Sequence, residues 1–425
     1  MKLHNLKIPE EQVSFKQAVV QGIGKEQGLF FSNQFKPLEN LDEILSMDFI
    51  ERSSHVIHHL IDAELSYQKV NEMVVNAFNF DLPIVDVSKD ISCLELFHGQ
   101  TLAFKDFGAR FMAQCVKLFN DKNHITILTA TSGDTGAAVA HAFHGIKGIN
   151  VKILYPKGKI SNLQEKLFCT LGGNIKTYAV EGDFDDCQAM VKSAFDSDVI
   201  RDKHNLTSAN SINMSRLLAQ VCYYFELVSR YYDDQLVVSV PSGNFGNLTA
   251  GLIAKKLGAP IKRFIAATNA NDTVPRFLLE NHWSPNKTIE TVANAMDVSN
   301  PSNWPRIMAL FNNDLNELKQ VVSACIKTDE QTFVAMQDLK KLGYIAEPHT
   351  AIAYAGLKDT IQDNEQGVFI STAHPSKFIE IVEKELNIKI NLPKALEDVK
   401  DKKNLSTTIT NDTSKFNAYL LKYIN

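Results

Sequence analysis

The sequence lacks any uninterrupted apolar stretch of the roughly 18–20 residues that a membrane-spanning helix needs. Its opening, MKLHNLKIPEEQVSF, lacks the apolar core of a secretory signal, and its two glutamates are atypical of an organellar transit peptide. The net charge of −5 offers no basic excess that would attract a nucleic acid or an anionic membrane. We therefore expect neither a membrane nor a nucleic acid as a partner.

Paired cysteines and the common metal-ligand patterns are also missing. The six cysteines are scattered, with no CxxC pair, which is typical of reduced thiols in a cytoplasmic protein. Histidines cluster at His55, His58 and His59, and again at His141 and His144, but neither cluster has a neighbouring cysteine or an HExxH frame. The sequence therefore predicts a cytoplasmic protein without a metal site.

The chain is long, and much of it alternates between short apolar runs and helical patterns. Its 425 residues are too many for one small core. Residues 1–95 carry apolar residues mostly at helical spacing, and from about residue 124 short apolar runs alternate with helical patterns. These runs are HITILTA, NVKILYP, IKTYAVEG, QLVVSVP, KRFIAATN and GVFISTA. Such an alternation indicates an α/β protein with two domains, each built on a mainly parallel sheet flanked by helices.

The predicted division of the chain has three parts. A mainly helical N-terminal segment, residues 1–95, packs on the large domain. Residues 96–215 form a smaller α/β domain that carries Lys105 and the TSGDTG loop. Residues 216–425 form a large α/β domain that carries the SGNFGN loop and a polar, weakly periodic C-terminal extension.

The first of three notable loops is PSGNFGN, residues 241–247, between an apolar run and a helical pattern. Ligands of parallel sheets bind at the carboxyl ends of strands, where this loop is expected. Gly243 and Gly246 permit close approach, and the following helix N-terminus presents N–H groups to an anion. The loop lacks GxxxxGK[ST], which excludes a nucleotide P-loop. The alternative is a plain turn in which Ser242 or Asn244 caps the helix.

The other two loops stand in similar positions. In TSGDTG, residues 131–136, Ser132, Thr135 and the backbone amides could hold a carboxylate or a phosphate, although Asp134 disfavours a strongly anionic ligand. A helix cap is the favoured alternative for this loop taken alone. In STAHPSKF, residues 371–378, Ser371 and Thr372 offer hydroxyl groups at the end of a strand, where polar residues are also common without a function.

The segment HGQTLAFKDFG, residues 98–108, places Lys105 beside apolar residues. Desolvation lowers the pKa of a lysine and favours its neutral amine, whereas a solvated lysine on an amphipathic element is the alternative. The letters DFG also occur in protein kinases, but the HRD…N loop and the GxGxxG loop of kinases are missing. Together with the three loops, this lysine suits pyridoxal phosphate, which has a phosphate, a ring nitrogen and an aldehyde that lysine captures.

Longer blocks of the sequence resemble the threonine synthase family. They are HGQTLAFKDFGARFMAQ, TATSGDTGAAVAHAF, PKGKISNLQEKLFCTLGG, SANSINMSRLLAQ and PSGNFGNLTAG, and the resemblance runs from about residue 3 to 390. It implies a pyridoxal-phosphate enzyme of fold type II, a carbon–oxygen lyase of threonine biosynthesis. The implied reaction converts O-phospho-L-homoserine and water to L-threonine and phosphate by γ-elimination and β-addition. A monomer or a homodimer is expected.

The resemblance also implies roles for single residues. Lys105 would bind the cofactor covalently and act as the catalytic base. The cofactor would further contact Gly243, Asn244, Phe245, Gly246 and Asn247 at its phosphate, Thr372 at its ring nitrogen and Asp134 beside its ring hydroxyl. The substrate carboxylate would bind at Ser132, Gly133 and Thr135, and its phosphate at Asn210, Ser211 and Arg216, with Lys159 a weaker candidate. A helix-surface ion pair is the alternative for Arg216.

Three positions depart from the family pattern. Gln100 stands where the pattern has a proline, Ala109 where it has a glycine and Asn162 where it has a proline. None of them belongs to the predicted site, so they bear on local geometry. Two other functions stay open: a related phospho-lyase that releases 2-oxobutyrate and phosphate, and an inactive relative that only binds the cofactor.

Overall fold

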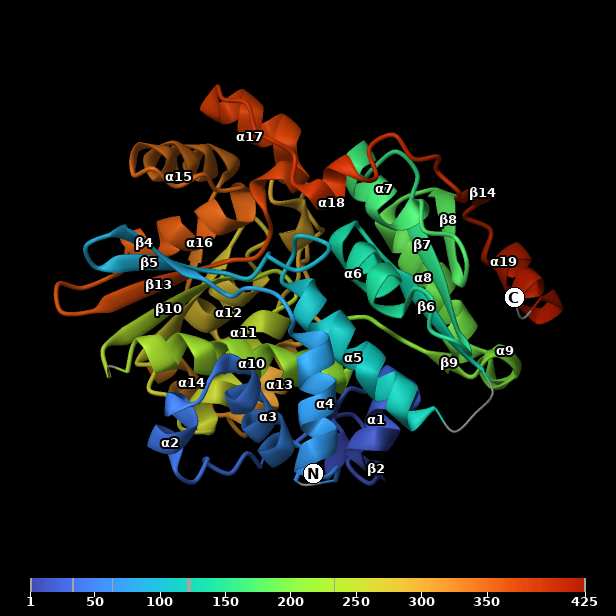
Figure 1. Cartoon of the computed structure of the whole chain (residues 1–425), viewed down its shortest axis with the longest axis horizontal. Coiled ribbons are helices and arrows are strands. Elements are labelled where there is room, and N and C mark those ends of the chain that lie inside the picture. The colour runs from blue at the N-terminus through green and yellow to red at the C-terminus, as the bar shows by residue number, and fades with distance from the viewer. Residues whose placement is uncertain (1, 33, 63, 121–123, 233, 424–425) are drawn as a thin grey trace.

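The computed structural model describes residues 2–32, 34–62, 64–120, 124–232 and 234–423. Two sheets dominate it (Figure 1). The six-stranded sheet has the order β12 (Val322–Ile326), β11 (Arg263–Thr268), β10 (Leu236–Pro241), β13 (Gln366–Ser371), β5 (Ile91–Glu95), β4 (Ile84–Ser88). All of its pairs are parallel except the antiparallel edge pair of β4 and β5.

The five-stranded sheet is parallel throughout. Its order is β14 (Thr407–Thr410), β8 (Ile175–Glu181), β7 (Ile149–Pro156), β6 (Ile125–Ala130), β9 (Leu206–Thr207). Every residue of β6 and of β10 is buried, because helices cover both faces of each central strand. The predicted α/β fold with two mainly parallel sheets is thereby confirmed.

Helices flank the two sheets. Those from residue 105 to 230 are α5 (Lys105–Phe119), α6 (Asp134–Phe143), α7 (Asn162–Cys169), α8 (Phe184–Asp196), α9 (Asp198–His204) and α10 (Met214–Arg230). Later ones are α11 (Gly246–Lys256), α12 (Thr273–Glu280), α13 (Trp304–Leu310), α14 (Leu315–Val321), α15 (Asp329–Lys341), α16 (Pro348–Lys358), α17 (Ile379–Leu386), α18 (Lys394–Glu397) and α19 (Thr413–Lys422). The 3₁₀ turns are η1 (Lys25–Gln27), η2 (Asn294–Met296) and η3 (Pro375–Phe378).

The N-terminal segment is mostly helical, with α1 (Phe15–Gln21), α2 (Leu41–Ser46), α3 (Phe49–Leu60) and α4 (Tyr67–Ala77). It also contains a small antiparallel sheet that the sequence did not reveal, formed by β1 (Leu3–Asn5), β2 (Gln12–Val13) and β3 (Phe30–Phe31). Its strands are too short to show a period of two. The almost wholly buried α10 packs against α3, α5 and α11 and so joins this segment to the rest of the core.

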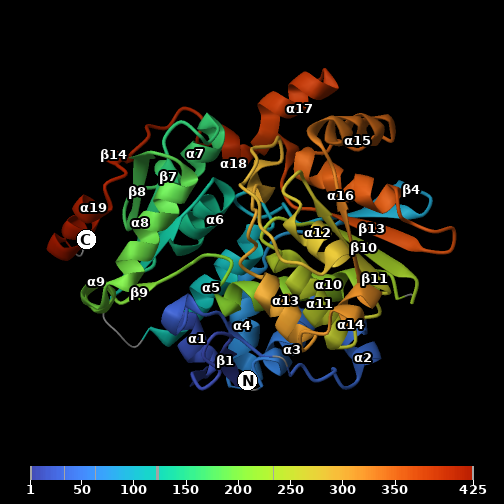
Figure 2. The same cartoon turned by 180° about the vertical axis from the view of Figure 1, so that it is seen from behind.

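The C-terminal extension differs from the predicted division. Strand β14 pairs with β8, and α19 packs on α8 and α9, so the end of the chain lies against the five-stranded sheet rather than in the large domain (Figure 2). The prediction failed because TTIT is a short, mostly exposed edge strand whose pairing no local pattern encodes. The boundaries at residues 95 and 215 stay predictions. Within the described ranges, no helix is long and apolar enough to cross a bilayer.

Candidate active site

Lys105 is the first residue of α5, and the chain before it is tightly held. Thr101 donates two hydrogen bonds to the carboxylate of Asp106, from its backbone N–H at 2.7 Å and its hydroxyl at 2.6 Å. Leu102 adopts a left-handed conformation with φ 59°, and the N–H of Phe104 donates to the carbonyl oxygen of Thr372 at 2.9 Å. These contacts fix the start of α5 against the carboxyl end of β13.

The Lys105 side chain is only 18% exposed, and its ammonium lies 3.6 Å from the carboxylate of Asp134. Burial lowers the pKa of Lys105, and the charges of Lys377 and Arg216 lower it further, against the opposing effect of Asp134. The Nζ atom also lies 5.6 Å from the centre of the Phe104 ring. This environment raises the fraction of neutral amine above that of a solvated lysine, and the neutral amine is the form that bonds to a carbonyl carbon or accepts a proton.

The TSGDTG loop follows β6 and opens α6. The hydroxyl of Thr131 accepts hydrogen bonds from the N–H groups of Gly133 and Gly136, and Gly133 has φ 139°. The Thr131 hydroxyl thus caps the first turn of α6, whereas the N-cap residue itself is Gly133, which has no side chain to do so. Within the described chain, the N–H groups of Ser132, Asp134 and Thr135 donate to no protein acceptor. They are free to bind a carboxylate at the helix N-terminus.

The SGNFGN loop follows β10 and opens α11, and no side chain of the loop caps this helix. Phe245 adopts a left-handed conformation with φ 61°, and a Cβ on Gly243 would lie 2.6 Å from Cα of Met296. Among the residues that the structure describes, the N–H groups of Gly243, Asn244 and Phe245 have no protein acceptor. The loop therefore has the geometry of an anion-binding cradle that only glycine can build at position 243.

The side chain of Asn247 does not point into the loop but contacts two tyrosines of α10. Its side-chain oxygen accepts hydrogen bonds from the hydroxyls of Tyr223 and Tyr224, both at 2.7 Å. The buried tyrosines thus hold the first turn of α11 from behind. Asn247 supports the loop in this structure, whereas its contact with the cofactor stays a prediction.

The NSINMSR segment lies beside this loop. The amide of Asn244 donates to the hydroxyl of Ser211 at 2.6 Å, and Asn210 accepts a hydrogen bond from Thr129 at 2.6 Å. Arg216 is 3% exposed, and burial lowers its pKa to about 10. Its Nη1 donates to the carbonyl of Ala209, whereas its buried Nε has no partner in the described part of the chain.

Arg216 is also without a carboxylate partner among the described residues, so the alternative of a surface ion pair is wrong. A buried guanidinium without an acidic partner is unfavourable by itself and suits a site that receives an anion. Lys159 is exposed in the turn after β7, next to Ile160, whose side chain lies beside Gly133, and its ammonium has no ion pair or hydrogen bond within the described ranges.

Several neighbours of the site were not predicted. Lys377 contacts Asp134, and Asn303 donates to the carbonyl of Asn244 at 3.1 Å. The fully buried Arg306 donates to Asn303 at 2.9 Å and to the carbonyl of Ile212 at 2.6 Å. For Lys377 the sequence held a signal, a lysine two residues after the STAHP segment, but for Asn303 and Arg306 it held none.

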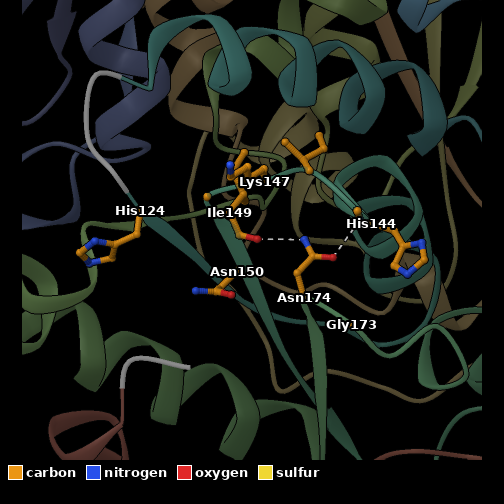
Figure 3. Close-up of a pocket in the computed structure, with 10 residues that line it drawn as sticks. His124, His144, Lys147, Ile149, Asn150, Gly173 and Asn174 are labelled. Carbon is orange, nitrogen blue, oxygen red and sulfur yellow. Dashed lines mark hydrogen bonds between the residues drawn. The ribbon is translucent and has the colours of Figure 1, made fainter.

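A cavity of about 450 Å³ lies apart from these residues (Figure 3). It is lined by His124, His144, Lys147, Asn150 and Asn174, at the amino ends of β6, β7 and β8. Asn174 is occupied there by hydrogen bonds to backbone groups of residues 143, 145 and 149. The candidate site occupies the opposite, carboxyl ends of the strands, where ligands of parallel sheets bind.

Comparisons with known proteins agree with this arrangement. A family model described as pyridoxal-phosphate dependent enzyme matches residues 87–372, and one described as threonine synthase, C-terminal, matches residues 350–420. A threonine synthase of Haemophilus influenzae is 56% identical over 99% of this chain and 100% of its own length.

Two solved structures are similar over nearly the whole chain. The crystal structure of threonine synthase from Escherichia coli has a TM-score of 0.95 and 54% identity, covering 99% of this chain and 100% of that one. The pyridoxal-phosphate-bound threonine synthase from Brucella melitensis has a TM-score of 0.93 and 28% identity, covering 99% of both chains. Fold type II is thereby confirmed.

Proposed function

The chain belongs to the threonine synthase family, and from this premise we propose how its site converts O-phospho-L-homoserine and water to L-threonine and phosphate. The observation that carries the proposal is the placement of Lys105. Its amine is 3.6 Å from Asp134 and within the electrostatic reach of the buried, unpaired Arg216. The site thus combines a base with a lowered pKa and a receptor for an anionic leaving group.

The residues present fit pyridoxal phosphate, the cofactor of the family. The unsatisfied N–H groups from Gly243 to Phe245 suit its phosphate, and Lys105 is placed to bond its aldehyde carbon. Thr372, 8% exposed at the end of β13, would face the ring nitrogen. Asp134 would accept a hydrogen bond from the ring hydroxyl. When bound, the cofactor supplies an electron sink for negative charge on substrate carbon atoms.

Lys105 moves protons in this proposal. As a neutral amine it takes the proton from the α-carbon of the substrate and later returns protons at the β-carbon. The lowered pKa keeps more of the amine in the neutral form near neutral pH. Asp134 orients the amine, because its carboxylate lies next to Nζ.

The two ends of the substrate bind on opposite sides of Lys105 in the proposal. The free N–H groups at Ser132 and Thr135 receive the carboxylate, as the N-terminus of α6 favours an anion. Arg216 receives the phosphate with bidentate hydrogen bonds, and Ser211 and Asn210 flank it. Arg216 also stabilises the phosphate as it leaves the γ-carbon.

The finer predictions about the setting of the protein also belong to this proposal. We propose a cytoplasmic enzyme that acts as a monomer or homodimer on a small-molecule substrate. The scattered cysteines support the location, since all six are free thiols. The net charge of −5 supports the absence of a nucleic-acid partner.

The proposal is tested with the purified protein. We expect a visible absorbance band from the bound cofactor, lost in Lys105→Ala, and formation of L-threonine with phosphate from O-phospho-L-homoserine. Formation of 2-oxobutyrate with phosphate, and little threonine, would assign the chain to the phospho-lyase alternative. A protein that stays colourless after incubation with pyridoxal phosphate would overturn the proposal.

A further inference from the structure

Lys377, in η3, is 1% exposed, which is rare for a lysine unless it is paired. Its Nζ atom lies 2.5 Å from Oδ1 of Asp134 and donates a hydrogen bond to the carbonyl oxygen of Thr101 at 2.9 Å. Lys105 approaches the other carboxylate oxygen, Oδ2, at 3.6 Å. One carboxylate is therefore held between two lysines.

The charges around this carboxylate are not balanced within the site. Lys377, Arg216 and, when it is protonated, Lys105 bring up to three positive charges, against the carboxylate of Asp134 and the buried side chain of Asp106, whose pKa is raised by burial. Buried cations without partners are unfavourable, and an arriving phosphate or carboxylate would compensate for them. The second lysine therefore needs an explanation beyond the stability of the fold.

The contacts of Lys377 join three segments that are distant in sequence. Lys377 follows β13 of the six-stranded sheet, and Asp134 follows β6 of the five-stranded sheet. Thr101 lies in the turn before Lys105 and is itself bonded to Asp106. The ion pair thus ties the two sheets together at the point where the catalytic lysine begins its helix.

We propose that Lys377 is a positioning residue that holds the Asp134 carboxylate between the two lysines, with Oδ2 turned toward Lys105 and the ring hydroxyl of the cofactor. This inference rests on the proposed roles of Lys105 and Asp134. Lys377 binds Oδ1 and so leaves Oδ2 for those two contacts. A carboxylate fixed in this way accepts a hydrogen bond without reorganising.

The electrostatics agree with this geometry. Burial by itself raises the pKa of Asp134, but Lys377 and Lys105 outweigh burial and hold this pKa well below its usual range. The charge of Lys377 also contributes to the lowered pKa of Lys105. Other charged or titratable groups face these three residues: Arg216 acts on Lys105, His349 acts on Asp134, and Asp106, His141 and His374 interact with the charge of Lys377.

The test compares Lys377→Met, which keeps the length of the side chain, with Lys377→Arg, which keeps its charge. In the cofactor-free proteins, an amine-reactive reagent labels Lys105 as a function of pH, and mass spectrometry of the peptide reads the yield. At a pH below the wild-type midpoint, we expect labelling of Lys105 to fall about fivefold in Lys377→Met, because the repulsion that favours the neutral amine is removed. Lys377→Arg should restore most of the yield.

Lys327→Met is the matched control, because Lys327 is also a buried lysine and pairs with Asp359. It should leave the labelling curve of Lys105 unchanged. The loaded enzymes give a second measurement, in which the pH profile of the visible band shifts in Lys377→Met and returns in Lys377→Arg. If Lys377→Met does not fold, Lys377→Gln, which can still donate to Thr101, takes its place.

An unchanged labelling curve and an unchanged pH profile in a folded Lys377→Met would overturn the inference, even if the variant were less stable. That outcome differs from failure of the proposed function, in which the wild-type protein itself binds no cofactor or forms no threonine.

Discussion

Gly108 of α5 lies against the backbone of Arg216 on α10. A Cβ on Gly108 would stand 3.0 Å from the carbonyl oxygen of Arg216 and 3.2 Å from its Cα. Gly108 follows Lys105 by three residues on the same helix. The close contact of α5 and α10 therefore sets the separation of the proposed base from the proposed phosphate receptor.

Gly108→Ala should lower activity more than stability. Alanine favours the helix by up to about 1 kcal/mol, whereas overpacking against a backbone costs about 1–3 kcal/mol. We expect the free energy of unfolding to fall by about 1 kcal/mol and kcat/KM to fall roughly tenfold as the two helices separate. Urea denaturation and steady-state kinetics measure the two effects. Leu118→Ala, at an exposed position of α5, is the control, and an unchanged kcat/KM in Gly108→Ala would contradict the argument.

Arg216→Met should separate function from stability. Losing a hydrogen bond to a charged phosphate removes about 1.5–3 kcal/mol, so we expect kcat/KM to fall roughly 10- to 150-fold. The cofactor-free protein should become more stable by about 1 kcal/mol, because a buried cation without a carboxylate partner is replaced by an apolar side chain. Kinetics and denaturant unfolding are the measurements.

The control for Arg216→Met is Arg52→Met. Arg52 is equally buried but pairs with the buried carboxylate of Glu226. Its removal leaves that carboxylate undercompensated and should lower the free energy of unfolding by about 3 kcal/mol. Equal losses of stability in the two variants would mean that Arg216 has a structural role.

Gly243→Ala should weaken the binding of the cofactor. The added Cβ meets the backbone of Met296 at 2.6 Å, so the loop must move away from η2 and the N–H groups lose their alignment. Gly246→Ala should be milder, since its Cβ would first meet the side-chain amide of Asn303 at 3.3 Å. Equilibrium titration with pyridoxal phosphate compares the two. We expect the Kd of Gly243→Ala to exceed that of Gly246→Ala by at least a factor of about ten, worth about 1.4 kcal/mol. Equal affinities would contradict the proposal that this loop binds the phosphate of the cofactor.

His141→Gln should reduce the loss of stability in acid. Burial lowers the pKa of His141 to about 4 from 6.5, while Nε2 faces the carbonyl oxygen of Leu167 at 2.6 Å. Between these pH values the unfolded chain binds more protons, so stability falls as pH falls, by at most about 1.4 kcal/mol per pH unit. Gln can still donate to Leu167. Unfolding free energies across this window should decline less steeply in His141→Gln than in the wild type, whereas those of a variant at an exposed histidine, His282→Gln, should decline like the wild type.

Much of the fold could be predicted because a parallel strand that is buried on both faces has a continuous apolar sequence, which can be recognised without its neighbours. HITILTA and QLVVSVP became β6 and β10, whose residues are buried throughout. The small sheet of β1, β2 and β3 could not be predicted, since strands of two or three residues leave no period. The pairing of β14 with β8 joins segments more than two hundred residues apart, which no local pattern records.

The candidate site also has parts that the sequence predicts and parts that it does not. Lys105 and the loops that open α6 and α11 could be proposed from sequence, because each is a contiguous motif with its own chemistry. The pairing of Lys377 with Asp134 and the close approach of Gly108 to Arg216 could not.

The sequence by itself determined which residue types follow which strand, and therefore the class of fold, the cofactor and the family. Only the tertiary structure decided how these residues stand to one another, that Arg216 is buried without an acidic partner, and that Lys377 shares Asp134 with Lys105. The physical reason is the sequence separation over which each kind of interaction acts. Strand runs and helix-opening loops depend on neighbours along the chain, whereas charge balance and helix contact depend on packing between distant segments.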